Sequence, residues 1–303
     1  MDSPRLVADG IWMLRNILVN VFFVGVDDGW ILVDAGLPGS TSAIRRAAFE
    51  LFGAMPPRAI VLTHGHFDHV GALPGLLEAW DVPVYAHSFE LPHLTGRLPY
   101  PSPDPTVGGG LVAWSSFLFP RRARDFGSRL LALPPDGRVP VAPDWVALHT
   151  PGHTAGHVSL FRPADGVVIA GDAVTTTQQE SLIAVATQRL ELNGPPAYFT
   201  VDWDAARWSV QRLAATGVET LLSGHGQPMA GAAMRLDLRN LAEHFDERAR
   251  PRRGRYVEHD AGEAAFERRW LRPLTAILII AASGALVAGL LSGTGRPRLS
   301  RAH

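Results

Sequence analysis

The strongest constraint on the fold of this chain is a pattern that recurs at four places. At each place a short apolar run, of the length expected for a buried strand, ends beside a glycine and a residue that can bind a metal ion. The four segments are VLTHGHFDHV (61–70), HTPGHTAGHV (149–158), VVIAGDAV (167–174) and LLSGHGQPM (221–229). Coincidence is a poor explanation for four such segments, so we expect their polar residues to meet in one site.

Apolar runs and helical spacing place the other elements coarsely. Strands are predicted at 21–24, 30–33, 59–62, 145–149, 158–161, 167–170 and 220–222. Helices are predicted at 40–52, 70–80, 202–215 and 230–245. The strands come in clusters with helices between them, which predicts an α/β fold of two sheets covered by helices.

Composition excludes several classes of protein. With 303 residues, 47% of them hydrophobic and 19% charged, the chain has the composition of a globular protein with a large core. The net charge is -1, so no basic field attracts nucleic acid and we expect no nucleic-acid partner. The chain has no cysteine, which excludes disulfides, thiolate nucleophiles and sulfur-ligated metals.

The first segment has the spacing of a metal site. In His64-x-His66, alternate residues of an extended loop point the same way, so both imidazoles can reach one ion. Asp68 and His69 point apart from that pair and are better placed for a second ion. Two metals about 3.5–4 Å apart, with a hydroxide between them, are a common hydrolytic arrangement.

These segments resemble the metallo-β-lactamase fold superfamily over roughly residues 10–230. The His-x-His-x-Asp-His motif of the family, its later histidines and aspartate, and its early aspartate match eight residues. They are His64, His66, Asp68, His69, His153 in PGHT, Asp172 in GDA, His225 in SGHG and Asp34 in VDAG. The resemblance implies an αββα sandwich, in which two sheets lie between helices.

The resemblance also implies a role for each matching residue. His64, His66 and His153 would hold one divalent ion. Asp68, His69 and His225 would hold the other, and Asp172 would bridge the two. Zinc is the first expectation for this nitrogen and oxygen set, with iron or manganese as alternatives. Asp68 and Asp172 are the candidate catalytic carboxylates, and the nucleophile would be a bridging hydroxide. Residues expected to support the ligands without binding an ion are Asp34, His149 and His157.

Comparison within the family narrows the reaction. β-Lactamases with a cysteine ligand are excluded, and those with only histidine ligands usually lack the aspartate that Asp172 matches. Glyoxalase II carries a helical C-terminal domain that is not evident here. The acyl-homoserine lactonases carry a tyrosine where this chain has residues 175–177, all threonine. We therefore expect a metal-dependent hydrolase that acts on an ester, thioester or lactone. The alternatives are a phosphodiester hydrolase and a non-catalytic metal-binding membrane scaffold.

The C-terminal part of the chain predicts a membrane anchor. Residues 274–292 read LTAILIIAASGALVAGLLS, without a charge, and as a helix of about 1.5 Å per residue they nearly span a hydrocarbon core of about 30 Å. We predict a catalytic domain at 1–247, a basic juxtamembrane linker at 248–272, a transmembrane anchor at 273–292 and a short tail at 293–303. The catalytic domain would face the cytoplasm in a single-pass membrane protein. The alternative is a buried helix of the globular domain.

The stretch at 99–126 has two interpretations. It begins with proline and glycine and continues with a dense apolar patch that includes Trp114, Phe117 and Phe119, followed by three arginines at 121, 122 and 124. It is either a short core helix with a solvated basic end or a lid over the metals. A lid would bind an acyl chain or enter a nearby bilayer, and it predicts a small, lipophilic substrate.

Overall fold

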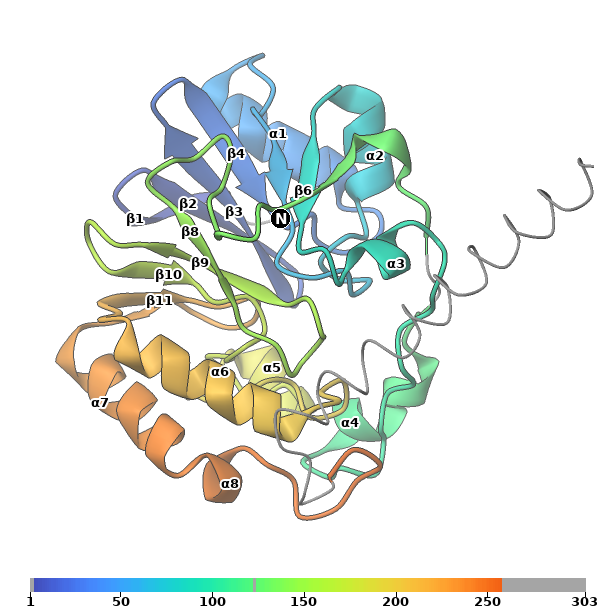
Figure 1. Ribbon diagram of the computed structural model, residues 1–303, viewed down its shortest axis with the longest axis vertical. Coiled ribbons are helices and arrows are strands. Elements are labelled where there is room, and N and C mark those ends of the chain that lie inside the picture. Colours follow the sequence, from blue (N-terminus) through green and yellow to red (C-terminus); the bar gives the residue numbers. More distant parts are fainter. Residues whose placement is uncertain (1–2, 122–123, 258–303) are drawn as a thin grey trace, which may run out of the picture. The chain divides into compact units, whose positions relative to one another are not determined.

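The computed structural model describes residues 3–121 and 124–257, which form two β-sheets with helices on their outer faces (Figure 1). By its internal contacts the chain divides into two units, Met1–His259 and Asp260–His303. All the described residues belong to the first unit. Two sheets with covering helices are the α/β arrangement that the strand and helix patterns predict.

The first sheet has seven strands in the order of the chain. They are β1 (Arg5–Ala8), β2 (Ile11–Asn16), β3 (Val19–Val26), β4 (Gly29–Val33), β5 (Ile60–Val61), β6 (Val84–Ala86) and β7 (Leu130–Ala132). The first four strands are antiparallel, whereas β4, β5, β6 and β7 run parallel to one another. Parallel strands need crossover connections, and the helices after β4 and β5 supply two of them.

The second sheet has five strands in the order β12-β11-β10-β9-β8. They are β8 (Val146–His149), β9 (Val158–Arg162), β10 (Val167–Ile169), β11 (Thr220–Leu222) and β12 (Met229–Ala230). Strand β9 is antiparallel to both β8 and β10, and β10 is parallel to β11. Strands β8, β10 and β11 therefore run in the same direction and end at the same edge of the sheet.

Helices connect these strands and cover the sheets (Figure 1). They are α1 (Thr41–Phe52), α2 (Leu73–Ala79), α3 (Leu91–Leu94), α4 (Leu111–Ser115), α5 (Leu182–Thr187), α6 (Trp203–Ala215), α7 (Gly231–Glu243) and α8 (Phe245–Arg248). Two 3-10 turns, η1 (Ser116–Leu118) and η2 (Gly127–Arg129), lie before β7. Helices α1 and α2 pack on the first sheet, and α6 and α7 pack on the second.

Strand β3 shows how alternation builds the layers. Val21 and Phe23 pack in the cluster that contains Ile44 of α1. Phe22, on the opposite face, packs in the cluster that contains Leu160 of β9, in the layer between the two sheets. Because successive side chains of a strand point to opposite faces, an unbroken apolar run serves both layers. Each fully buried side chain of this kind contributes about 1.5–3 kcal/mol.

No helix within residues 3–121 and 124–257 is long and apolar enough to cross a membrane. The two longest described helices, α6 and α7, have 13 residues each, or about 20 Å at 1.5 Å per residue. Both are amphipathic, with one face in the core and the other in solvent. This finding corrects the predictions of a transmembrane helix in the fold class and of a single-pass membrane location. The apolar stretch from which they were drawn, 273–292, lies outside the described residues, as do 258–272 and the tail.

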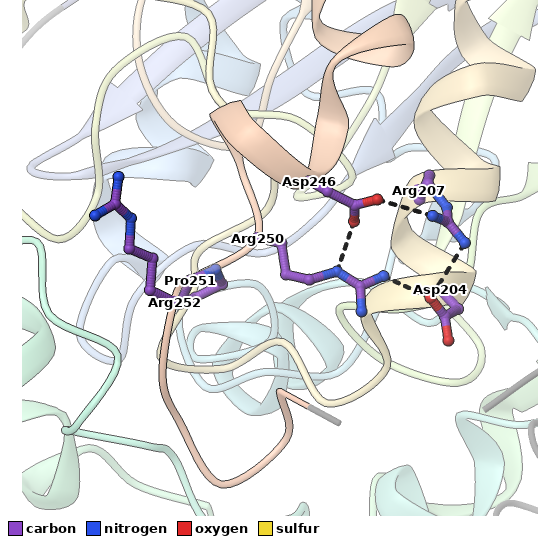
Figure 2. A pocket seen from close by; sticks show the side chains of 6 residues that line it. All are labelled: Asp204, Arg207, Asp246, Arg250, Pro251 and Arg252. Carbon is purple, nitrogen blue, oxygen red and sulfur yellow. Dashed lines mark hydrogen bonds and ion pairs between the residues drawn. The ribbon is translucent and has the colours of Figure 1, made fainter. Parts of the chain in front are cut away.

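The first residues of the predicted linker pack against the helices of the second sheet. Arg250 is buried, and its guanidinium contacts Asp204 of α6 at 2.5 Å and Asp246 of α8 at 2.7 Å. Arg207 contacts the same two aspartates, at 3.3 and 2.8 Å, which closes a ring of four charges (Figure 2). The ring fixes residue 250 to α6. The predicted domain boundaries at 247, 272 and 292 stay predictions.

Candidate metal centre

The ends of parallel strands bring the predicted ligands to one edge of each sheet. In the first sheet, β4 and β5 are parallel neighbours, so Asp34 after β4 lies beside the 64–69 loop after β5. In the second sheet, His153, Asp172 and His225 follow β8, β10 and β11, which end at the same edge. Segments that are far apart in the sequence thus meet between the sheets, as their shared pattern predicts.

The structure gathers the seven predicted ligands, all buried except Asp68, into overlapping groups. His64, His66 and His153 form one group, and Asp68, His69 and His225 form another; in each, the ligand atoms lie within 4.8 Å of one another. Asp172 forms a third group with His64 and His69. The first two groups have the composition that the family resemblance implies for two ions. The roles of the individual ligands stay predictions.

Several atoms of this cluster are buried without a hydrogen-bond partner among the described residues. They are Nε2 of His64, Nε2 of His69 and Oδ1 of Asp172. An unsatisfied buried polar atom costs about 1–3 kcal/mol, and such atoms are rare in native proteins. Imidazole nitrogens and carboxylate oxygens suit divalent metal ions. The residues therefore fit a dinuclear divalent metal site.

Charges divide the cluster into two halves. On the side rich in carboxylates, Asp172, Asp34 and Asp68 outweigh the effect of burial and raise the pKa of His69 well above its usual value. Likewise, Asp172 and Asp68 outweigh burial and raise the pKa of His225 to about 10. On the other side, burial lowers the pKa of His66 to about 4. Without metal, the first half would hold protons that an ion must displace, whereas the second half would be neutral.

Asp34 is placed to orient the ring of His69. Its Oδ2 lies 2.8 Å from Nδ1 of His69, and the same oxygen accepts a hydrogen bond from the hydroxyl of Thr63 at 2.8 Å. Its Oδ1 accepts from the backbone N–H of Thr63 at 2.8 Å. Asp34 is buried and has a positive φ of 62°, a conformation that aspartate tolerates better than most residues. With Nδ1 donating to the carboxylate, Nε2 of His69 is left free to bind an ion.

The two histidines that flank His153 have different environments. Nε2 of His157 accepts a hydrogen bond from the backbone N–H of Asp172 at 2.9 Å, and its Nδ1 lies 2.9 Å from the hydroxyl of Thr150. His157 is thus placed to hold the loop that carries Asp172. His149 donates Nε2–H to the carbonyl of Ala155 at 2.8 Å, within the turn that carries His153.

Sequence reasoning missed the residues that fix the loop of His225. The carbonyl of Leu18 lies 2.8 Å from Nδ1 of His225 and fixes the orientation of the ring. The amide of Asn20, which is buried in β3, donates to the carbonyls of Ser223 and Gly226 at 2.9 and 2.8 Å. In the sequence, Asn20 is the one polar residue of the apolar run VNVFFV, and this is the feature that could have identified it as a residue with a specific role.

Close packing also explains the glycine before His225. A Cβ at Gly224 would overlap Oδ1 of Asp172, and it would lie 2.8 Å from Cε1 of His69. No side chain can therefore be accommodated at position 224 while both ligands keep their places.

Aromatic side chains line one side of the cluster. Phe199 stacks on the ring of His66, with centroids 4.5 Å apart, and Phe119 lies 5.7 Å from Phe67 and 5.9 Å from Phe199. We call Phe67, Phe119 and Phe199 the aromatic wall. Trp114 and Phe117, which were predicted with Phe119 as a lid, are 63% and 57% exposed. Only Phe119 of the three thus belongs to the wall.

Sequence comparisons connect the chain with metallo-hydrolases. The profile of the metallo-beta-lactamase superfamily matches residues 15–225. The probable metallo-hydrolase YflN of Bacillus subtilis is 48% identical over 239 residues, covering 78% of this chain and 90% of YflN. The uncharacterized protein YobT of the same organism is 30% identical over 221 residues, covering 72% and 87%.

Solved structures share the fold at lower identity. A metallo-beta-lactamase family protein of Thermus thermophilus has a TM-score of 0.56 at 21% identity, covering 80% of this chain and 81% of that one. BJP-1, a subclass B3 metallo-beta-lactamase of Bradyrhizobium japonicum, has a TM-score of 0.55 at 21% identity, covering 81% and 93%. At this identity the similarity shows the arrangement of sheets and helices and does not extend to the substrate.

Proposed function

Because the chain belongs to the metallo-β-lactamase superfamily and carries its His/Asp metal site, we propose that it is a metal-dependent hydrolase of esters, thioesters or lactones, with zinc as the metal. Membership of a family of metallo-hydrolases supports the reaction type. The bond that is cleaved, the metal and the route of the reaction are the parts that we propose.

The observation that carries the proposal is the position of Asp172 between the two ligand groups. Its Oδ2 lies 3.5 Å from Nε2 of His153 and 3.3 Å from Nε2 of His225, and its Oδ1 lies 3.4 Å from Nε2 of His69. One carboxylate thus faces ligands of both groups. This placement suits a residue that holds two ions close together.

When bound, two divalent ions supply a water molecule of lowered pKa as the nucleophile and polarise the oxygen of the bond under attack. The chain would supply orientation and a proton acceptor. The side chain of Asp68 is 16% exposed, whereas that of His225, at 3.4 Å from its Oδ2, is 4% exposed. Asp68 is therefore the ligand best placed to face a substrate, to orient the attacking water and to accept its proton.

The aromatic wall supports a lipophilic acyl group on the substrate. Phe199 lies against a predicted ligand, so an apolar group bound to the wall would lie close to the reacting bond. Burying each CH₂ of an acyl chain there contributes about 0.8 kcal/mol. We propose that Phe119 contacts the acyl group and that the exposed Trp114 and Phe117 contact the far end of longer chains.

The test is a substrate panel on the full-length protein with its metal content measured. We expect turnover of p-nitrophenyl esters and a preference for decanoate over acetate. Phe119→Ala should reduce that preference about tenfold or more while leaving the metal content unchanged. Phe49→Ala, at an exposed position of α1, is the control and should change neither. Turnover of bis-p-nitrophenyl phosphate without turnover of any carboxylic ester or lactone would instead establish the phosphodiester alternative.

A further inference from the structure

Glu90 is a buried carboxylate to which sequence reasoning assigned no role. It directly precedes α3 and its exposure is 0%. Its Oε1 accepts hydrogen bonds from the hydroxyl of Thr154 at 2.7 Å and from the backbone N–H of Gly156 at 2.9 Å. Its Oε2 accepts from the backbone N–H of Gly65 at 3.0 Å and from the hydroxyl of Tyr100. The carboxylate therefore receives four donors, two on each oxygen.

Three of these donors, Gly65, Thr154 and Gly156, belong to the two loops that carry the group of His64, His66 and His153, and the fourth, Tyr100, follows α3. Gly65 lies between His64 and His66 in the loop after β5. Thr154 directly follows His153 in the loop between β8 and β9. The two loops come from different sheets, and Glu90 is bonded to both. The same two loops also meet at their histidines, where Nδ1 of His66 lies 2.9 Å from Nε2 of His153.

The atoms around Glu90 are closely packed. A Cβ at Gly156 would lie 2.8 Å from Oε1 of Glu90, and a Cβ at Gly65 would overlap the hydroxyl of Tyr100. The ring of Tyr100 also lies 4.7 Å from that of His66. Burial raises the pKa of Glu90, but the nearby His93 and the donated hydrogen bonds outweigh it and lower the pKa, which keeps the side chain charged. Hydrogen bonds to a charged acceptor are stronger than those to a neutral one, so Glu90 holds the two loops together.

We propose that Glu90 is a positioning residue: by joining the two loops it fixes the spacing of His64, His66 and His153, and so sets the affinity of the ion that these three histidines hold. Glu90 itself contacts neither ion nor substrate. The inference rests on the metal site of the proposed function. It predicts that Glu90 acts mainly on this ion, because its donors Gly65 and Thr154 adjoin His64, His66 and His153 in the sequence, whereas none of its four donors adjoins Asp68, Asp172 or His225.

The experiment is a zinc titration of the full-length chain against a chromophoric chelator, with Glu90→Gln as the variant. Glutamine keeps the size of the side chain but presents an NH₂ to two of the four donors. Loss of an outer partner of a ligand typically weakens metal binding 10–100-fold. We expect one ion to bind at least tenfold more weakly and the other to stay within twofold. Glu180→Gln, which alters a carboxylate bonded to the backbone of Ala197, is the control and should leave both affinities unchanged.

Two backgrounds identify the affected ion. His225→Ala leaves His64, His66 and His153 in place, so in this background Glu90→Gln should weaken binding of the remaining ion by the same factor. His153→Ala disrupts that group, so there Glu90→Gln should have no further effect. A cobalt(II) spectrum of Glu90→Gln in the His225→Ala background should change in its d–d bands, which loss of stability alone would not produce.

Unchanged zinc affinities in Glu90→Gln would overturn the inference. An equal loss of affinity for both ions would also overturn it, because it would indicate a general structural role. If Glu90→Gln does not fold, Tyr100→Phe and Thr154→Val can be used, because each removes one donor. Each should weaken binding of the same ion several-fold. Wild-type affinities in both of those variants would also overturn the inference. A wild-type chain that binds no zinc would contradict the proposed function itself. Tight binding of two zinc ions by both wild type and Glu90→Gln would contradict only the role of Glu90.

Discussion

Replacing Asp34 with asparagine should weaken the binding of the ion that Asp68, His69 and His225 are proposed to hold. The change keeps the shape of the side chain but replaces Oδ1 or Oδ2 with an NH₂. Asparagine can satisfy the backbone N–H of Thr63 with its oxygen, which turns the NH₂ toward Nδ1 of His69. Nδ1 would then accept a hydrogen bond, and the proton of the neutral ring would move to Nε2. A protonated Nε2 cannot bind a metal ion.

The size of the effect follows from the lost interactions. The Asp34 carboxylate accepts three hydrogen bonds of 2.8 Å, each worth about 1.5–3 kcal/mol to a charged acceptor, and asparagine can replace only part of them. We expect a loss of 10–100-fold in the affinity of one ion, or about 1.4–2.7 kcal/mol, and little change in the other. Zinc titration against a chelator measures both affinities.

Asp104→Asn is the matched control for this prediction. Asp104 is also buried, and it accepts hydrogen bonds from the backbone N–H and the hydroxyl of Thr106 at 2.9 and 2.6 Å, outside the metal centre. Its replacement should lower stability without changing zinc affinity. The reasoning on the tautomer of His69 is refuted if Asp34→Asn and Asp104→Asn bind zinc equally well.

Three further predictions concern the packing, the core and the charges of the site. Gly224→Ala should lower zinc content below that of wild type, because the added Cβ overlaps Asp172; full zinc content by mass spectrometry would contradict the packing argument. Phe22→Ala, in the layer between the sheets, should reduce the free energy of unfolding by about 3–5 kcal/mol in urea, and a loss below 1 kcal/mol would contradict the layer assignment. In metal-free protein the pKa of His225 is raised to about 10 from 6.5, so its stabilising contribution is complete below about pH 6.5 and is lost as the pH rises through 10. Urea unfolding of chelated protein should show that decline between pH 7 and 10, and His225→Ala should make it smaller without abolishing it, because the pKa of His69 is also raised.

Much of the fold could be predicted from local pattern. The apolar runs at 21–24 and 30–33 became β3 and β4, and the helix predicted at 40–52 is α1 (Thr41–Phe52). Several of the missed strands are short or lie at a sheet edge. Strand β7 (Leu130–Ala132) belongs to the apolar run LLAL at 130–133, but it is an edge strand of the first sheet and two of its three residues are exposed. Edge strands and short elements depend on their neighbours more than on their own sequence.

The site was predictable where its chemistry lies in one segment and less so where it depends on distant partners. The motif at 64–69 indicates metal ligands by itself, and the structure brings it to the later histidines. Glu90 was missed because its partners Thr154 and Gly156 lie more than 60 residues away, and in the sequence it resembles any surface glutamate. The prediction of a membrane anchor used an uncharged apolar stretch and the basic residues around it, a local pattern that does not distinguish a membrane span from other apolar segments.

The most direct test of the central claim is hydrolytic activity as a function of zinc bound per chain. Full-length protein is stripped of metal by exhaustive chelation, zinc is added in steps, and bound zinc and ester turnover are measured on the same samples. The two ligand groups, with Asp172 facing ligands of both, predict no activity without zinc and a plateau at two ions per chain. Turnover that persists after complete removal of metal, or a chain that binds no zinc, would contradict the account.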